Sequence, residues 1–311
     1  CLRFDGMKSP NVLAGKTKYS FLISDDQVRQ AQKYDGEDSP KFWKYTRGMW
    51  SPEGVCKTVL SENLVEKYRV MFPAVFVKKS HMMAGLDPAF NGGDRCVIQL
   101  GRYGDFDNGK MGISLEGNEI IQIDAKSSEP VHFQIASRVR AICEENNVKP
   151  EHLAIDATGE GGGLCDILAK TWNPSIQRVE FGGKASDRPV SPEDHRKSSD
   201  VYANKVTELW FSVRQWVINE QLRGMHHEAV IEFCARMFDD EKRMTIIERK
   251  VDMKARTGQS PDFADAITLV VEMARRLGGY ASATRQRGGL SNWDQLVKDC
   301  DSVYHNTFAE V

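Results

Sequence analysis

The sequence has no long apolar segment, no paired-cysteine motif and no excess of charge of one sign. No apolar run approaches the roughly 18 to 20 residues that cross a membrane, and no signal segment opens the chain, so we expect no membrane association. The seven cysteines show no CxxC spacing, and their odd number disfavours both a disulfide framework and a zinc ribbon. This pattern is typical of a reducing, cytoplasmic compartment.

The formal net charge is only −2, so a nucleic-acid surface would have to be a local basic patch or act through bound metal. A phosphate-binding loop is also missing. Gly15-Lys16-Thr17 has the end of such a loop, but Pro10 stands where its first glycine is needed. ATP binding within this chain is therefore not expected.

The 311 residues divide into three expected parts: a small linker or accessory region over 1–80, an α/β domain over 81–280, and a flexible C-terminal tail over 281–311. Apolar patterning predicts that the α/β domain is a mixed β-sheet flanked by helices. The expected strands are 82–87, 96–100, 119–124, 152–156, 175–181 and 243–247, and the expected helices are 131–147, 164–171, 201–218, 226–237 and 261–277. The polar loop 182–198 has a length typical of binding or catalytic loops.

Two aspartates mark the start of the last predicted helix. Pro261 suits its first turn and Ser260 its cap, so Asp262 and Asp265 should lie one turn apart on one face. Two carboxylates about 5 to 6 Å apart repel each other unless a cation or a hydrogen-bond donor lies between them. An unusually acidic helix cap is the alternative interpretation.

Two further aspartates, Asp87 and Asp156, each end a strand-like run. Either one alone is equally typical of a turn. In open α/β sheets, however, functional groups gather at the carboxyl ends of the strands. Together with the pair on the last helix, they would form a cluster of oxygen ligands that suits Mg²⁺ or Mn²⁺. Two such ions about 3.5 to 4 Å apart can drive phosphodiester hydrolysis, so the pattern predicts a metal-dependent nuclease.

Three segments carry a family resemblance: GLDPAFNGGD at 85–94, IDATGEG at 155–161 and KARTGQSPDFADA at 254–266. In this order they resemble the nuclease motifs of the large terminase subunits of tailed bacteriophages. The segment YANKVTELW at 202–210 resembles the stretch that follows the mobile loop in such nucleases. The likeness extends over residues 80–278.

The resemblance implies an RNase H-like fold and an endonuclease that cuts concatemeric viral DNA with two Mg²⁺ or Mn²⁺ ions during genome packaging. By motif, Asp87, Asp156 and Asp265 would be catalytic and metal-binding. Asp262 takes the position where some members have His or another ligand, which makes it a further metal-binding candidate. The implied partners are double-stranded DNA, the portal protein and the small terminase subunit, in the host cytoplasm. Residues 1–80 would be a linker or a remnant of an upstream ATPase region.

Basic residues near the last helix could contact DNA phosphates, although the acids interspersed among them are equally typical of a solvated surface. The first candidate set is Lys242, Arg243, Arg249, Lys250, Lys254 and Arg256, and a second set in the polar loop is Lys184, Arg196 and Lys197. Asp94 and Glu160 are more typical of a turn and a solvated surface than of metal ligands. Trp210 is expected in the core rather than at a base-stacking surface.

Other functions remain open from the sequence. Another RNase H-like nuclease, such as a junction resolvase or a transposase-like enzyme, would share the acidic cluster. An actin-like or sugar-kinase-type ATPase also uses strand-borne aspartates, and the turn Asp156-Ala157-Thr158-Gly159 is the one feature that favours it. A non-enzymatic scaffold in a packaging complex is a third possibility.

Overall fold

A six-stranded mixed sheet forms the centre of the molecule, with strand order β5-β4-β1-β2-β3-β6. The computed structural model describes residues 5–34, 36–37, 42–49, 57–78, 80–90, 93–191, 194–240 and 243–278, so the predicted tail lies outside the described residues. The strands are β1 (His81–Asp87), β2 (Val97–Asp105), β3 (Met111–Ile120), β4 (Leu153–Asp156), β5 (Gln177–Val179) and β6 (Leu222–Arg223). β1, β2 and β3 are antiparallel, whereas β4 joins β1 in parallel. The predicted α/β class with a mixed sheet is confirmed.

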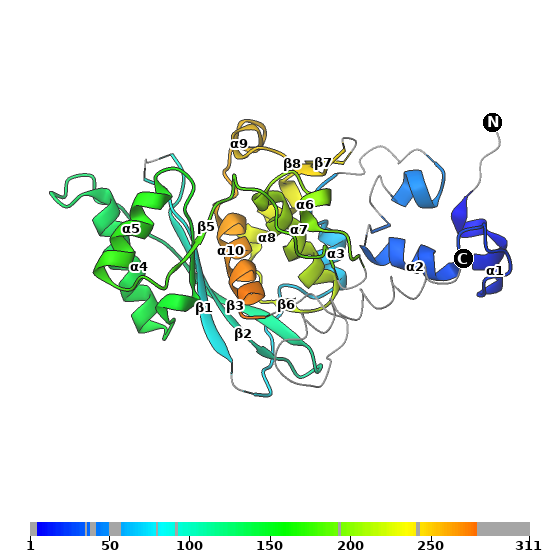
Figure 1. Cartoon of the computed structure of the whole chain (residues 1–311), viewed down its shortest axis with the longest axis horizontal. Helices are drawn as coiled ribbons and strands as arrows, with labels where there is room; N and C mark the ends of the chain where they lie inside the picture. The colour runs from blue at the N-terminus through cyan, green and yellow to red at the C-terminus, as the bar shows by residue number, and fades with distance from the viewer. Residues whose placement is uncertain are drawn as a thin grey trace, which may run out of the picture.

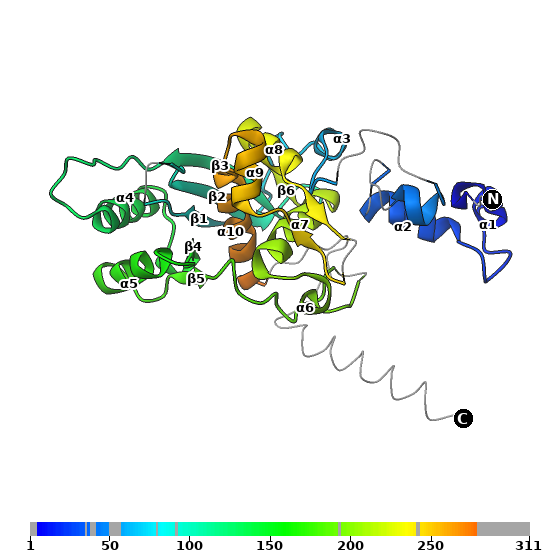
Figure 2. The same ribbon diagram turned by 90° about the horizontal axis from the view of Figure 1, so that it is seen from above.

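Helices cover both faces of the sheet (Figure 1). On one face lie α4 (Val131–Glu145) and α5 (Gly161–Thr171), and on the other α7 (Lys205–Ile218), α8 (His227–Ala235) and α10 (Asp262–Arg276) (Figure 2). The remaining elements are η1 (Gly6–Lys8), α1 (Pro10–Ala14), α2 (Asp25–Tyr34), η2 (Phe42–Thr46), α3 (Glu62–Lys67), η3 (Pro150–His152), α6 (Ser198–Val201), α9 (Lys250–Thr257) and the paired strands β7 (Phe238–Asp239) and β8 (Ile246–Ile247). Within the described ranges, no helix combines the length and apolarity needed to cross a bilayer.

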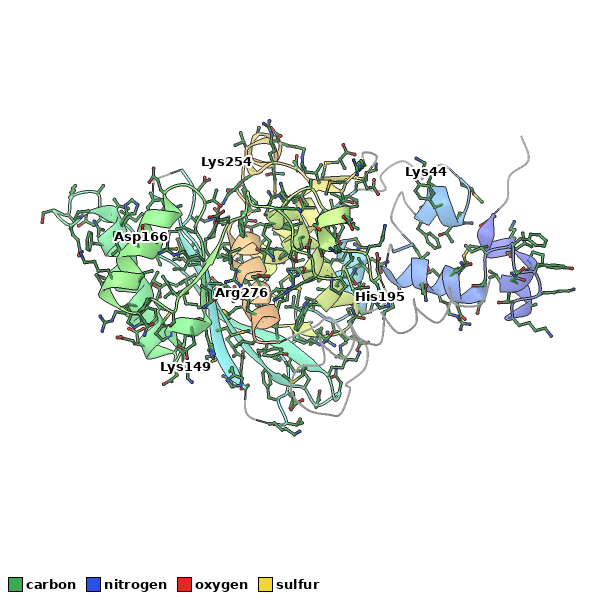
Figure 3. The ribbon with its side chains drawn as sticks, viewed as in Figure 1. Lys44, Lys149, Asp166, His195, Lys254 and Arg276 are labelled. Carbon is green, nitrogen blue, oxygen red and sulfur yellow. The ribbon has the colours of Figure 1, made fainter. Side chains whose placement is uncertain are left out.

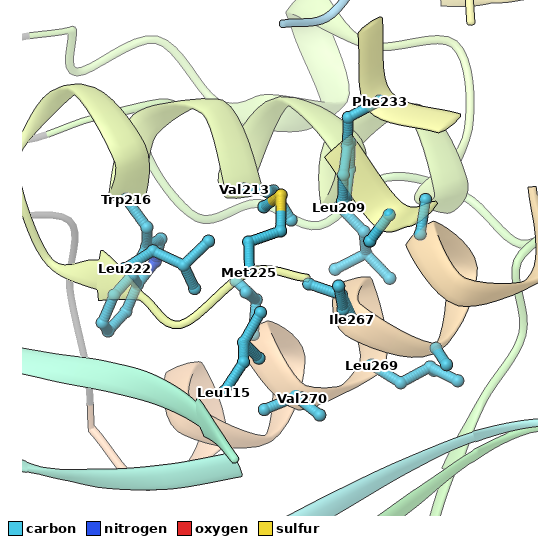
Figure 4. Close-up of a cluster of buried hydrophobic side chains, with 14 of the residues drawn as sticks. Leu115, Leu209, Val213, Trp216, Leu222, Met225, Phe233, Ile267, Leu269 and Val270 are labelled. Carbon is cyan, nitrogen blue, oxygen red and sulfur yellow. The ribbon is translucent and has the colours of Figure 1, made fainter. Parts of the chain in front are cut away.

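Strand β1 is buried on both faces, which explains its continuous apolar run. Met83 belongs to the core shared with α7 and α10, part of which Figure 4 shows, whereas Ala84 and Leu86 belong to the core under α4 and α5. Gly85 lies directly beneath α10, because a Cβ atom there would stand 2.4 Å from the carbonyl oxygen of Ala266. This close approach brings the first turn of α10 near the carboxyl end of β1.

The segment that precedes β1 contributes to the same core. Val59, Leu60, Val65 and Val70 are buried in the cluster with α7 and α10, so residues 57–78 pack against the domain that was expected to begin at residue 81. Helices α1 and α2 lie farther out (Figure 1).

The segment Gly15-Lys16-Thr17 follows α1 rather than leading from a strand into a helix, which a phosphate-binding loop requires. Gly15 is left-handed (φ 61°) and ends α1. The buried amide of Asn11 then holds the backbone of Lys18, Tyr19 and Leu22, so this loop is closed by its own hydrogen bonds.

The predicted third strand exists, but its predicted bounds of 119–124 are wrong. The hairpin continues through β2 and turns at Asp107-Asn108-Gly109, where Gly109 has φ 78°, and β3 returns over Met111–Ile120. Asn-Gly is a strong hairpin-turn signal, and it places the strand earlier than the apolar residues near position 120 indicated.

Other boundaries differ as well. The predicted helix 201–218 is two helices, α6 and α7, because Asn204 interrupts it and caps α7 through the backbone N–H of Thr207. Helix α5 begins at Gly161 rather than at residue 164, and a Cβ at Gly161 would collide with the carbonyl oxygen of Asp156. The predicted strand 243–247 is limited to β8, and the basic stretch after it forms α9.

Candidate active site

Asp87 and Asp156 lie at the carboxyl ends of two neighbouring strands of the sheet. Their strands, β1 and β4, are parallel neighbours, and Leu86 pairs with Ile155 immediately before the two aspartates. This adjacency is the condition under which the two aspartates can belong to one cluster. Adjacent strands are about 4.8 Å apart, so this register places the two carboxylates side by side.

The first turn of α10 adds Asp262 and Asp265, and Lys250 of α9 lies among the carboxylates. Its Nζ is 2.9 Å from Asp87 Oδ2, 3.0 Å from Asp262 Oδ1 and 3.5 Å from Asp265 Oδ2. All three carboxylates are almost completely buried. The structure thus supplies the cation that two carboxylates on one helix turn require, and that cation is a lysine that the sequence analysis assigned to DNA binding.

The oxygens of Asp262 and Asp265 that face away from Lys250 are held by the protein. Asp262 Oδ2 accepts hydrogen bonds from the backbone N–H and the Nε of Arg95, both at 3.1 Å. Asp265 Oδ1 accepts from Trp210 Nε1 at 2.8 Å and from Arg236 Nη1 at 3.1 Å. Each carboxylate is therefore fixed through one oxygen and presents the other to the centre of the cluster.

Asp156 is held in the same way from its own loop. Its Oδ1 accepts hydrogen bonds from the backbone N–H of Thr158 at 3.0 Å and from Thr158 Oγ1 at 2.6 Å. Burial raises the pKa of Asp156, and the negative charge of Asp265 raises it further, against the lowering effect of the Thr158 donors. Asp265 therefore couples the strand-end carboxylate of β4 electrostatically to the cluster.

Lys250 and the carboxylates around it shift one another's pKa values. Burial raises the pKa of Asp87 well above its usual range, and Asp265 and Asp262 raise it further, although Lys250 opposes the shift. Burial alone would lower the pKa of Lys250, but the three surrounding carboxylates raise it instead. Lys250 therefore stays protonated.

The donor set suits a hard divalent cation. Carboxylate oxygens are the preferred ligands of Mg²⁺ and Mn²⁺, and three of them already converge on a cation, the Lys250 ammonium. Across the described ranges, no group of three or more His, Cys, Asp or Glu side chains is arranged to hold a metal ion as it stands. The ammonium occupies the centre, so binding of a divalent ion requires that Lys250 be displaced.

Several residues that orient the cluster were not found from the sequence: Thr158, Trp210, Arg236, Arg95 and Glu232. Trp210 is fully buried, as expected, but it also donates to Asp265. Glu232 of α8 is buried beside Arg95, and burial raises its pKa to about 7. Thr158 lies inside the IDATGEG motif, which was the one available signal. The others are far from the aspartates in sequence.

The predicted DNA-binding residues are largely engaged with local acids. On and around α9, Arg249 pairs with Asp252, Lys254 with Asp94, and Arg256 with Glu248. In the polar loop, Arg196 pairs with Asp194 and Lys197 with Asp187. Figure 3 shows Lys254 on α9 and His195 at a separate part of the surface. Among the described residues, neither Arg243 nor Lys184 contacts the acidic cluster, and Lys242 lies outside the described residues. The DNA interface therefore stays a prediction.

The two weaker acidic candidates do not pair with Lys250, which contacts Asp87, Asp262 and Asp265 instead. Asp94 is bound by Lys254 at 2.6 Å, and Glu160 is exposed at the start of α5.

No protein-family model and no curated protein matches the chain. Among solved structures, the chain is similar to the nuclease domain of the large terminase subunit gp2 of bacterial virus Sf6, with 14% identity and a TM-score of 0.50 over 69% of this chain and 98% of that one. A mutant of that domain with manganese and β-thujaplicinol gives 14% identity and a TM-score of 0.47 over 68% and 94%. RuvC of Thermus thermophilus gives 12% identity and a TM-score of 0.31 over 63% and 96%.

The first of these similarities, together with the sheet order and the flanking helices, identifies the fold. The chain has an RNase H-like fold, as the family resemblance implied, and the nuclease domain of the Sf6 large terminase subunit has the same fold.

Proposed function

We propose that this chain is the nuclease domain of a phage terminase large subunit, a metal-dependent endodeoxyribonuclease. The observation that carries the proposal is the convergence of Asp87, Asp262 and Asp265 on one cation, beside Asp156, on a terminase-type fold. An acidic cluster of this kind at the carboxyl ends of adjacent strands is the arrangement that divalent-metal phosphodiester hydrolysis needs.

Asp87, Asp156 and Asp265, with Asp262, would hold two Mg²⁺ or Mn²⁺ ions. Such ions supply an activated water and stabilise the leaving oxygen of the phosphodiester. Trp210 and Arg236 keep Asp265 in one orientation, and Thr158 does the same for Asp156. Lys250 balances the carboxylates and would have to leave the centre of the cluster for them to hold divalent ions.

The substrate in this proposal is concatemeric double-stranded DNA, cut in the host cytoplasm while a genome is packaged. The sequence motifs at 85–94, 155–161 and 254–266 support this assignment, because they resemble terminase motifs in order. Portal protein and small terminase subunit are the partners that the same resemblance implies. Arg249, Lys254 and Arg256 lie on or next to α9, the helix that carries Lys250, where they would follow DNA phosphates once released from their acidic partners.

The proposal is tested by plasmid cleavage. We expect the purified chain to nick supercoiled DNA with Mn²⁺ and to lose this activity to background in Asp87→Asn. The matched control is Asp166→Asn, because Asp166 lies on α5 with its side chain 72% exposed, paired with Arg178 (Figure 3). Full activity of Asp87→Asn, or cleavage in the presence of a chelator, contradicts the metal mechanism. A strong preference for cleaving four-way junctions would instead indicate that the chain is a junction resolvase.

A further inference from the structure

Arg95 connects three groups around the start of α10. Besides its two bonds to Asp262 Oδ2, its Nη2 donates to Glu232 Oε1 at 2.7 Å and to the backbone carbonyl of Ser260 at 2.9 Å. Its guanidinium also lies 4.5 Å from the ring centre of Phe263. A planar guanidinium with this many directed bonds has little freedom to rotate.

Glu232 anchors this arrangement from α8. The residue is 2% exposed, and both of its oxygens are used: Oε1 accepts from Arg95, and Oε2 accepts from the backbone N–H of Ala264 at 2.7 Å. The residue before α10 is Pro261, which provides no side-chain cap, so Glu232 caps this helix from another element. One carboxylate therefore fixes both the helix start and the guanidinium.

We propose that Arg95 is a positioning residue for the metal-binding cluster. The guanidinium is fixed by its bond to Glu232 and donates to Asp262 Oδ2, so that Asp262 presents only Oδ1 to a divalent ion. The position of Asp262 Oδ1, 3.0 Å from Lys250 Nζ, shows that this oxygen already faces a cation. This inference rests on the proposed function, because it assumes that the cluster binds a divalent metal.

A simple counter-charge would behave in the opposite way. A positive group 3.1 Å from a ligand carboxylate repels a divalent ion, so removing it raises the affinity for metal if charge is all that Arg95 contributes. If the Arg95 side chain orients Asp262, removing it lowers the affinity, because Asp262 Oδ2 is then held by the backbone N–H of residue 95 alone and the carboxylate must be ordered again when metal binds. The sign of the change therefore separates the two roles.

The test is Mn²⁺ titration followed by electron paramagnetic resonance, with wild type, Arg95→Lys and Arg95→Met. We expect both variants to bind Mn²⁺ about 10-fold or more weakly, as is typical when an outer-shell partner of a ligand is lost. Cleavage should recover at saturating Mn²⁺, because the carboxylates themselves remain. Arg138→Met is the matched control, since Arg138 makes a comparable two-bond pair with Glu119, both bonds at 2.6 Å, on β3 and α4. Its Mn²⁺ affinity should equal that of wild type.

Unchanged or tighter Mn²⁺ binding in Arg95→Lys overturns the inference. The lysine keeps the positive charge but lacks the planar guanidinium with its several directed donors. Arg95→Lys therefore separates the positioning role from the charge even where Arg95→Met does not fold. Mn²⁺ binding that is lost in Asp87→Asn but retained in Arg95→Lys overturns the positioning role alone. A wild-type chain that binds no Mn²⁺, or an Asp87→Asn variant that binds it as tightly as wild type, overturns both this inference and the proposed function.

Discussion

At the scale of single residues, the aspartates of the cluster differ in how the fold supports them. Asp87 is buried with Lys250 as its partner, and its pKa is raised by burial and by two neighbouring carboxylates. Asp265 is also buried, but Trp210 and Arg236 donate to it directly. The same Asp→Asn change should therefore affect stability in opposite directions at the two positions.

We expect Asp87→Asn to stabilise the chelator-treated protein at pH 7. A raised pKa means that the folded state favours protonated Asp87, so this contribution to stability is present at low pH and is lost as the pH rises through the folded pKa. At neutral pH the ionised side chain is a cost that Asn removes. Urea unfolding at pH 7 measures the change, and a clear loss of stability in Asp87→Asn would contradict this account.

Asp265→Asn should instead destabilise the protein by about 3 kcal/mol, because it leaves the guanidinium of Arg236 buried without its charged partner. The same urea experiment applies. Unchanged or increased stability of Asp265→Asn would contradict this role of the Arg236 pair.

At the scale of elements, the position of α10 against β1 determines where its two aspartates lie. Gly85 makes this possible, because an added Cβ would stand 2.4 Å from Ala266 O and 2.8 Å from both Leu269 Cβ and Val270 N. Two of these three atoms belong to the helix backbone, so the contact can be relieved only by moving α10. The glycine of the GLDP motif is therefore a packing requirement as well as part of a motif.

We expect Gly85→Ala to cost at least about 1 to 3 kcal/mol and to weaken Mn²⁺ binding, because the helix must move away from the strand. Thermal unfolding and Mn²⁺ titration measure the two effects. Gly117→Ala in β3 is the control, since among the described residues no heavy atom comes within 4 Å of the Cβ that would be added there. Equal behaviour of the two variants would show that α10 does not depend on this close approach.

At the scale of the whole molecule, a buried ionic network joins α7, the polar loop and the C-terminal end of α10. Glu208 of α7 accepts hydrogen bonds from the backbone N–H and the Oγ of Ser186, at 2.6 and 2.7 Å, and pairs with Lys205 and Arg275. Burial alone would raise the pKa of Glu208, but these partners lower it to about 2. The loop 182–198 is thus anchored to the helix that carries Asp262 and Asp265.

We expect Glu208→Gln to cost about 3 kcal/mol at pH 7, because the pKa of this almost fully buried carboxyl is lowered from its usual 4.5 to about 2. A lowered pKa contributes stability above the unfolded value, near 4.5, and this contribution is lost as the pH falls through about 2. The variant should therefore lose less stability than wild type between these pH values. Unfolding measured at pH 7, 4 and 3 tests this. Glu119→Gln, in an exposed pair with Arg138, should change stability by no more than about 1 kcal/mol.

The sequence by itself determined the local features. The apolar runs that end at Asp87 and Asp156 and the helix that begins near Asp262 follow from patterns a few residues long, and these patterns predicted an α/β domain with a mixed sheet. The order of the motifs carried the family resemblance, which implied the RNase H-like fold. The Asn108-Gly109 turn signal was also present in the sequence, but the apolar residues near position 120 led to a predicted third strand that begins too far along the chain.

Only the tertiary structure decided how the carboxylates are held. Arg95 lies 167 positions from Asp262, Trp210 lies 55 from Asp265, and Arg236 lies 29 from it. Lys250 was predicted to bind DNA because its neighbours in the sequence are basic. It lies 163 positions from Asp87 in the sequence, yet α9 places it in the centre of the cluster. Hydrogen bonds and ion pairs between distant segments leave no periodic trace in a sequence, because they depend on how α8, α9 and α10 pack together at one edge of the sheet.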